Sequence, residues 1–248
     1  MSAGLPARTP FEETIQPMSV LPRPDEKAAV VQTMFDRIAP DYDRMNRLLT
    51  FGTDQRWRKS LVRRLEIGPS DRVLDLASGT GDFASVCVEA GAEVIALDFS
   101  RGMLLAATRR DDLRGTLVQG DALALPLPNS SVTAAVSGFA LRNFVEIEPA
   151  FRELGRVIQP GGRLGLLEVD RPRSRIIAAG HHVYFDRVVP IIGGILSDGT
   201  AYRYLPESAS YLPNQADLVA MLVRSGFHRI QKRSHLFGAA QSITAVRK

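Results

Sequence analysis

The sequence has only one cysteine, Cys87, and no long uninterrupted apolar run. A single thiol cannot form an internal disulfide, which favours a reducing compartment. No apolar stretch approaches the roughly 18 residues of a membrane-spanning helix, and no charged-then-apolar leader opens the chain. These absences predict a cytoplasmic protein.

A strong excess of one charge is also missing. The net charge is +4, and the basic residues are scattered except for Arg56–Lys59 and Arg63–Arg64. That cluster could face nucleic acid or an anionic membrane, but a solvated helix face is the simpler interpretation. Without an RNA-binding module, the sequence does not favour a nucleic acid partner.

The length and composition favour one α/β domain. The chain has 248 residues, of which 45% are hydrophobic and 23% charged, enough for one well-filled core. We expect a flexible, proline-rich arm over residues 1–25 and a single domain over 26–248. Its expected parts are a helical cap (26–70), a core (71–170), a substrate cap (171–213) and a final helix and strands (214–248).

Apolar periodicity predicts two helices before the core. Asp25 is a plausible N-cap, and apolar residues recur at helical spacing from Val30 to Ile38. A second amphipathic stretch runs from Thr53 to Leu65 and is ended by Gly68 and Pro69.

From residue 72 onward, strands and helices alternate, which predicts a doubly wound, mostly parallel sheet. The expected strands are 72–77, 93–98, 117–118, 132–138 and 164–169, and a turn at 160–162 precedes the last. The expected helices are 82–90, 100–109 with Ser100 as N-cap, 146–158 and 215–225. Strands at 228–235 and 240–246 would close a seven-stranded sheet as an antiparallel pair.

The central motif is Arg72–Asp82, a buried strand that enters a glycine turn. Gly79 and Gly81 permit a tight turn that exposes backbone amides at a helix start. A Walker loop is excluded because no lysine follows, and a dinucleotide fingerprint is excluded because its third glycine is missing. The remaining pattern, D-L-A-x-G-T-G-D, resembles motif I of the class I methyltransferases that use S-adenosylmethionine.

Polar residues at other strand ends should meet this loop in one crevice. Asp98 can accept two hydrogen bonds from a ribose diol, although a helix cap is an alternative role. Asp121 and Ala122 can meet an adenine edge, Met103 can lie against the base, and Ser137 would lie on the crevice floor. A turn aspartate and ordinary packing residues are the competing interpretations of these positions.

The match to known sequences extends beyond motif I. The blocks Phe35–Asp43, Leu49–Gly52, Phe139–Asn143, Arg156–Gly162 and Tyr202–Ser208 occur in order. Together they resemble the ubiquinone/menaquinone biosynthesis C-methyltransferase family over about residues 30–235. The resemblance implies a Rossmann-like class I methyltransferase fold with an N-terminal helical cap.

The resemblance implies S-adenosyl-L-methionine as cofactor, with S-adenosyl-L-homocysteine as product. It places cofactor contacts at Thr80, Asp98, Asp121, Ala122 and Ser137. The full expected cofactor set adds Tyr42, Ala77, Gly79, Phe99 and Met103. The expected catalytic residues are Arg142 and Asn143, which would orient the quinol oxygens, Asp43 as a base, and Tyr184. His181 and His182 are adjacent and would point apart on a helix, so no metal site is expected.

The implied reaction is methylation of a ring carbon in a demethylated polyprenyl quinol. Its isoprenoid tail would favour peripheral contact with the inner membrane face through Phe51, Trp57 and the apolar residues of 183–196. A soluble aromatic or secondary-metabolite acceptor stays open, as does a protein that binds the cofactor without transferring methyl. The sequence is compatible with a homodimer.

Overall fold

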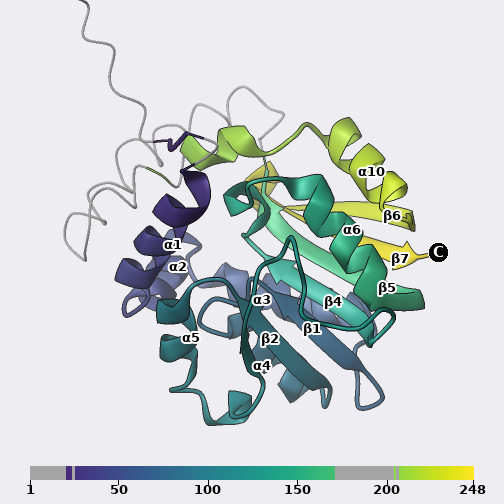
Figure 1. Ribbon diagram of the computed structural model, residues 1–248, viewed down its shortest axis with the longest axis horizontal. Coiled ribbons are helices and arrows are strands. Elements are labelled where there is room, and N and C mark those ends of the chain that lie inside the picture. Colours follow the sequence, from purple (N-terminus) through teal and green to yellow (C-terminus); the bar gives the residue numbers. More distant parts are fainter. Residues whose placement is uncertain (1–20, 24–25, 171–203, 205–206) are drawn as a thin grey trace, which may run out of the picture.

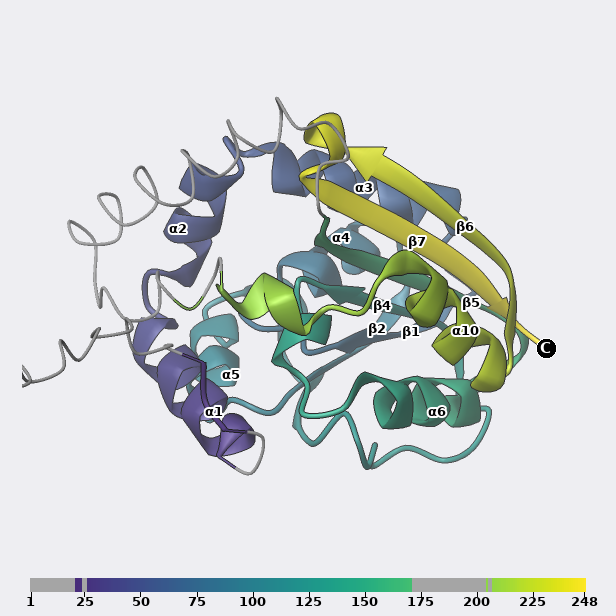
Figure 2. The ribbon, with the colours of Figure 1, turned by 90° about the horizontal axis from the view of Figure 1, so that it is seen from above.

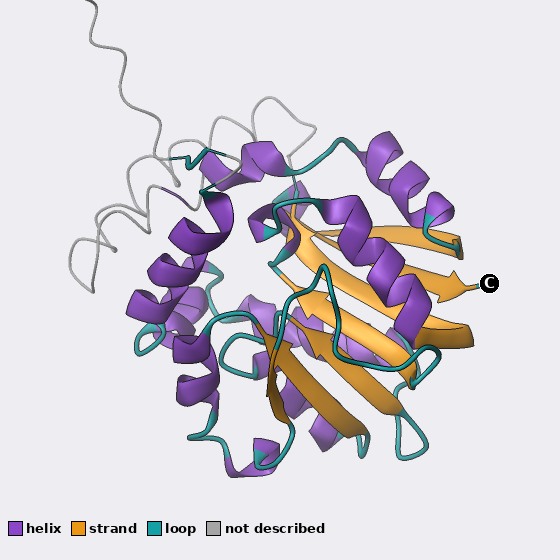
Figure 3. Cartoon of the chain, in the orientation of Figure 1, coloured by secondary structure: helices purple, strands orange, loops and turns teal. Residues whose placement is uncertain are grey.

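A seven-stranded mixed sheet forms the centre of the protein (Figures 1 and 3). The computed structural model describes residues 21–23, 26–170, 204 and 207–248. The strand order is β3-β2-β1-β4-β5-β7-β6, and only β7 runs antiparallel to its two neighbours, β5 and β6. The strands are β1 (Arg72–Leu76), β2 (Glu93–Asp98), β3 (Leu117–Gln119), β4 (Val132–Gly138), β5 (Ile158–Val169), β6 (Phe227–His235) and β7 (Ala240–Arg247). The predicted fold class, with its antiparallel closing pair, is confirmed.

Helices cover both faces of the sheet (Figure 2). One layer contains α3 (Thr53–Arg64) and α4 (Asp82–Glu89), and the other contains α6 (Ile147–Val157) and α10 (Gln215–Arg224). Alternation within β1 explains the two layers, because successive side chains of a strand point to opposite faces. Val73 joins the core under α3 and α4, whereas Leu74 and Leu76 join the core under α6 and α10.

The N-terminal helices occupy two different places. Helices α1 (Lys27–Ile38) and α2 (Tyr42–Leu49) lie beside α5 (Arg101–Ala107), where Ile38, Met45 and Met103 form a small buried cluster. Helix α3, the second helix expected within the 26–70 cap, packs directly on the sheet. Helix α2 was not predicted as a helix, since it is short and mostly polar and is held by contacts with the core.

The start of α5 and the start of β5 differ in how closely they follow the sequence. Ser100 caps α5, as predicted, by accepting a hydrogen bond from the Met103 amide at 3.1 Å. The sequence predicted a turn at 160–162 before a strand beginning at residue 164. That prediction is wrong, because β5 already begins at Ile158 and continues to Val169. Gly161 has a φ of 78°, and the pairing of β5 with β4 shifts register there, so the extra residues form an irregularity within the strand.

Several expectations fall on residues that the structure does not describe. They concern Asp25 as N-cap, the arm before residue 21, and most of the expected substrate cap, including Tyr184 and the 183–196 segment. Helix α1 begins at Lys27, and the side chain of Glu26 at its N-cap position makes no capping hydrogen bond. Among the residues that are described, no helix is both long and apolar enough to cross a lipid bilayer.

Candidate functional site

The glycine loop between β1 and α4 has the backbone geometry that its sequence predicts. Gly79 and Gly81 adopt φ values of 58° and 89°, which glycine reaches without steric cost. Ala77 also has a positive φ, of 55°, although it carries a Cβ. Such strain is maintained only where the surroundings impose it, and it is concentrated at functional sites.

Asp98 fixes this loop from the carboxyl end of β2. Its Oδ2 accepts a hydrogen bond from the Gly79 amide at 2.7 Å, and its Oδ1 accepts one from the Ser100 amide at 2.8 Å. Burial raises the pKa of Asp98 to about 6, even though both amide hydrogen bonds favour the charged form. The carboxylate therefore braces the loop and also lines the crevice.

The crevice holds a pocket of about 880 Å³, including its open mouth. We call it the main pocket. Its floor comes from the ends of β1 and β2, and one wall comes from Phe139 to Val145, after β4. Most of its lining is apolar, including Leu76, Leu97 and Met103, as expected for a small-molecule site.

A smaller pocket of about 310 Å³, the side pocket, adjoins the main pocket at the glycine loop. The two share Tyr42, Ala77, Gly79 and Gly138, so they are parts of one crevice. The side pocket is also lined by Arg58, Asp75, Ser78, Thr80, Asp82 and Phe83. Three of its buried polar atoms have no hydrogen-bond partner: Arg58 Nε, Asp75 Oδ1 and Ser78 Oγ.

Charged side chains attach α2 and α3 to the glycine loop. Arg47 donates two hydrogen bonds to Asp82, both at 2.9 Å, and one to Asp54 at 2.8 Å. Arg110 donates to Asp82 at 2.6 Å and to Asp43 at 3.0 Å. Burial acts to raise the pKa of Asp82, but the Arg47 hydrogen bond and the nearby guanidinium charges outweigh it and lower the pKa.

A second buried ion pair supports the wall after β4. Arg142 Nη1 donates to Glu168 Oε1 at 2.6 Å and to the Phe139 carbonyl at 2.9 Å. The neighbouring Asn143 lines the main pocket, and its Oδ1 accepts a hydrogen bond from the Tyr204 hydroxyl at 3.3 Å. Burial raises the pKa of Tyr204 to about 12, so this hydroxyl remains a donor at neutral pH.

The structure brings most of the predicted site residues together. Those that line the main pocket are Tyr42, Ala77, Gly79, Asp98, Phe99, Met103, Asp121, Ala122 and Asn143. Thr80 lines the side pocket, and its hydroxyl donates to Asp43. The roles assigned to these residues stay predictions.

Three predicted site residues are placed outside the two pockets, and a fourth is not described. Ser137 lines neither pocket, since it is buried and its hydroxyl donates to the Leu76 carbonyl at 2.8 Å. Asp43 and Arg142 are engaged in ion pairs and also line neither pocket. Tyr184 lies outside the described residues.

Sequence reasoning missed the contribution of α1 to the site. Ala28, Val31, Gln32 and Phe35 line the main pocket, and the Phe35 ring packs edge-on against Tyr42 with centroids 5.9 Å apart. The apolar spacing of α1 had identified Val31 and Phe35 as one helix face, but not the crevice that this face covers. Arg58 was noted only as part of the basic cluster Arg56–Lys59, which was interpreted as a solvated helix face.

These features fit S-adenosylmethionine. Asp98 offers a carboxylate for a ribose, the apolar main pocket accommodates an adenine, and the orphaned polar atoms of the side pocket suit a charged amino-acid group. The doubly wound sheet places all three at the carboxyl ends of its strands. The fold and site together define a class I S-adenosylmethionine-dependent methyltransferase.

Comparison with known proteins specifies the family. Residues 23–247 match the ubiE/COQ5 methyltransferase family, and the chain belongs to it. It is 47% identical over 201 residues to the demethylmenaquinone methyltransferase of Thermus thermophilus, covering 78% of this chain and 91% of that protein. It is 42% identical over 205 residues to the ubiquinone/menaquinone biosynthesis C-methyltransferase of Syntrophotalea carbinolica. That match covers 81% of this chain and 86% of that protein.

Solved structures agree on the fold. A crystal structure of a SAM-dependent methyltransferase from Thermotoga maritima superposes with a TM-score of 0.62 at 20% identity. That match covers 87% of this chain and 99% of the other. As a member of the ubiE/COQ5 methyltransferase family, the chain is a methyltransferase with S-adenosylmethionine as its cofactor.

Proposed function

We propose that this enzyme methylates a ring carbon of a demethylated polyprenyl quinol, either a demethylmenaquinol or a ubiquinol precursor. The names of its relatives support this acceptor class. The observation that carries the proposal is the apolar main pocket, which runs from the glycine loop to Asn143 and Phe144 and can hold an aromatic ring beside the cofactor.

The cofactor, when bound, supplies an electrophilic methyl group. A ring carbon is nucleophilic enough to accept it only when the acceptor is reduced and its hydroxyl is losing a proton. The protein must therefore orient the quinol oxygens and stabilise negative charge on them. Asn143 is suited to orient an oxygen, since its amide lines the pocket and is held by Tyr204.

Arg142 supplies fixed positive charge behind this wall. Its charge lowers the pKa of both Tyr42 and Tyr204, although burial dominates and raises each pKa overall. The positive charge of Arg142 would likewise favour the phenolate form of a quinol bound in the main pocket. Asp43 is already engaged by Thr80 and Arg110, so we propose that it positions the glycine loop rather than accepting a substrate proton directly.

The test is a labelling reaction. Purified protein is incubated with methyl-labelled S-adenosylmethionine and demethylmenaquinone, either chemically reduced or left oxidised, and the products are analysed by mass spectrometry. We expect label on a ring carbon in the reduced reaction alone. Normal cofactor binding with no labelled quinone under reducing conditions would refute the proposed acceptor and direct the search to soluble aromatic compounds.

We further propose peripheral contact with a membrane, because a long isoprenoid tail leaves the bilayer only at high cost. In support, Phe237 and Leu236 in the β6–β7 turn are 82% and 43% exposed. The turn lies close to α3, where the Trp57 ring stacks on His235 with centroids 5.5 Å apart.

Co-sedimentation with anionic phospholipid vesicles tests this contact. We expect binding by the wild-type protein and weaker binding by Phe237→Ser, with Val223→Ser on α10 as an exposed apolar control. Equal retention of all three proteins in the supernatant would contradict peripheral contact.

A further inference from the structure

Arg58 is a buried arginine whose known contacts leave part of its guanidinium without a partner. The residue is 5% exposed. Its Nη1 donates to Asp54 Oδ2 at 2.5 Å, but its Nε has no hydrogen-bond partner. A buried donor left unsatisfied is unfavourable and rare in native proteins, so the Nε requires an explanation.

The surroundings of Arg58 place it in the cofactor crevice. Its guanidinium carbon lies 5.8 Å from the centre of the Phe83 ring and 5.6 Å from that of Phe139. A Cβ added to Gly138, at the end of β4, would lie 3.9 Å from Arg58 Nη2. The guanidinium is therefore held between two aromatic rings at the carboxyl ends of the strands, where it lines the side pocket.

Complementary groups lie in the same pocket. Asp75 Oδ2 accepts a hydrogen bond from the Ala84 amide at 2.8 Å, which leaves its Oδ1 without a partner, and Ser78 Oγ is also unpartnered. The pocket thus presents unsatisfied donor and acceptor atoms together. An α-amino acid group, with one carboxylate and one ammonium, could satisfy both kinds.

We propose that Arg58 binds the α-carboxylate of the methionyl part of S-adenosylmethionine. This deepens the proposed function, since it rests on the cofactor assigned there. An arginine suits the role because its charge is permanent and its planar fork matches the two oxygens of a carboxylate. Helix α3 thereby contributes directly to cofactor recognition, and Tyr42 lines both this side pocket and the main pocket.

A ligand lacking only the carboxylate tests the proposal. Binding calorimetry compares S-adenosylmethionine with its decarboxylated form on the wild-type protein, on Arg58→Gln and on Arg64→Gln. Arg64 is the matched control: it lies on the same helix but donates to Ser242 Oγ at 3.0 Å and lines neither pocket.

We expect the wild type and Arg64→Gln to bind the intact cofactor roughly 10- to 100-fold more tightly than the decarboxylated ligand. For Arg58→Gln this preference should fall to about threefold or less, through weaker binding of the intact cofactor alone. Equal weakening toward both ligands would indicate a structural role and overturn the proposal.

The wild-type comparison can overturn the proposal even if Arg58→Gln does not fold. Equal affinity of the wild type for the two ligands would overturn the role of Arg58 while leaving methyl transfer to a quinol intact. Conversely, a wild-type preference for the carboxylate that Arg58→Gln loses, with no labelled quinone, would support Arg58 and refute the proposed acceptor.

Discussion

Asp98 braces the glycine loop through its carboxylate and is predicted to bind the ribose of the cofactor through the same group. As a carboxylate it accepts hydrogen bonds from Gly79 and Ser100 and is available to a ribose diol. Because burial raises its pKa to about 6, the carboxyl takes up a proton as the pH falls through that value. The protonated form is a poorer acceptor for the two ribose hydroxyls.

We therefore predict that affinity for S-adenosylmethionine falls below about pH 6, by up to tenfold for each pH unit. Above that pH, Asp98 is ionised and its own contribution to the affinity should level off. Calorimetry between pH 5 and 7.5 measures this profile. Asp98→Asn should bind weakly at every pH, with no inflection near pH 6, and an unchanged inflection in that variant would assign the titration to another group.

The Arg142 guanidinium neutralises the buried carboxylate of Glu168 and so contributes to the stability of the fold. Removing it leaves Glu168, only 2% exposed, without its cation, and breaking a buried ion pair in this way costs about 3–5 kcal/mol. We predict that Arg142→Met lowers the free energy of unfolding by about this amount and also lowers turnover. Affinity for the cofactor should stay near that of the wild type, because Arg142 lines neither pocket.

The double variant Arg142→Met, Glu168→Gln separates the two effects. Removing the stranded carboxylate should restore much of the lost stability in urea unfolding, while turnover stays low. Recovery of turnover together with stability would show that Arg142 acts only on folding.

At the scale of elements, the glycine loop between β1 and α4 has no space for a side chain at Gly81. A Cβ added to Gly81 would lie 2.2 Å from Leu113 Cδ1 in addition to requiring a positive φ. Gly115 also has a positive φ, of 80°, but has no atom within 4 Å of an added Cβ. The two positions therefore separate the cost of backbone strain from the cost of steric overlap.

We predict that Gly115→Ala lowers the free energy of unfolding by about 1 kcal/mol, from strain alone. Gly81→Ala should lose about 1–3 kcal/mol more, because Leu113 must move. Urea unfolding of both variants measures the difference. Equal losses would mean that the loop relaxes around the added methyl group at no cost.

Elements with strong local signals were predictable from the sequence. The apolar runs of β1 and β2, the Ser100 cap and the glycine loop all appear where expected, since each is specified by neighbouring residues. Helix α2 was missed because its stability comes from distant partners, such as Arg47 bonded to Asp82. Arg58 was missed as a buried residue for the same reason, because its burial depends on the tertiary packing of α3 against β5 and α4.

At the scale of the whole molecule, the cofactor crevice is assembled from distant parts of the chain. The sheet supplies its floor, whereas α1 supplies one wall through Val31 and Phe35. Helix α2 connects α1 to the body of the protein, and its Arg47 reaches Asp82 at the start of α4. Attachment of the N-terminal helices and completion of the cofactor site are therefore coupled.

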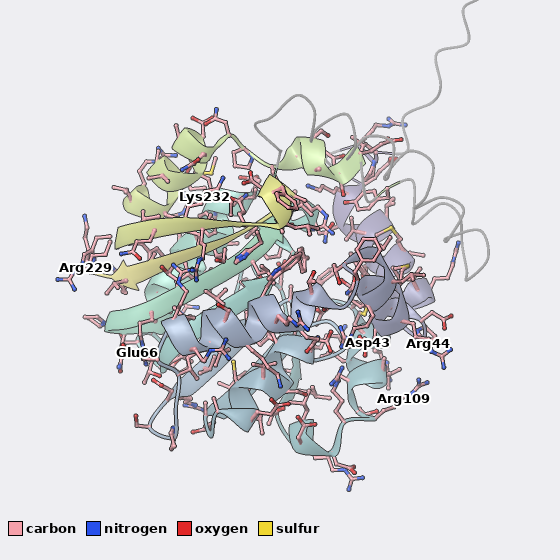
Figure 4. All side chains as sticks on the ribbon, turned by 180° about the vertical axis from the view of Figure 1, so that it is seen from behind. Asp43, Arg44, Glu66, Arg109, Arg229 and Lys232 are labelled. Carbon is pink, nitrogen blue, oxygen red and sulfur yellow. The ribbon has the colours of Figure 1, made fainter. Side chains whose placement is uncertain are left out.

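We predict that Arg47→Met weakens cofactor binding although Arg47 lines neither pocket. If the state in which α1 and α2 are docked on the body of the protein falls to one-tenth of the population, the apparent Kd for the cofactor rises about tenfold. Hydrogen exchange of the α2 amides should accelerate in parallel. Arg44→Met is the matched control, since Arg44 is 82% exposed and projects from the edge of the molecule beside Asp43 (Figure 4). Faster exchange in α2 with an unchanged Kd would show that the N-terminal helices cover the crevice without contributing to cofactor affinity.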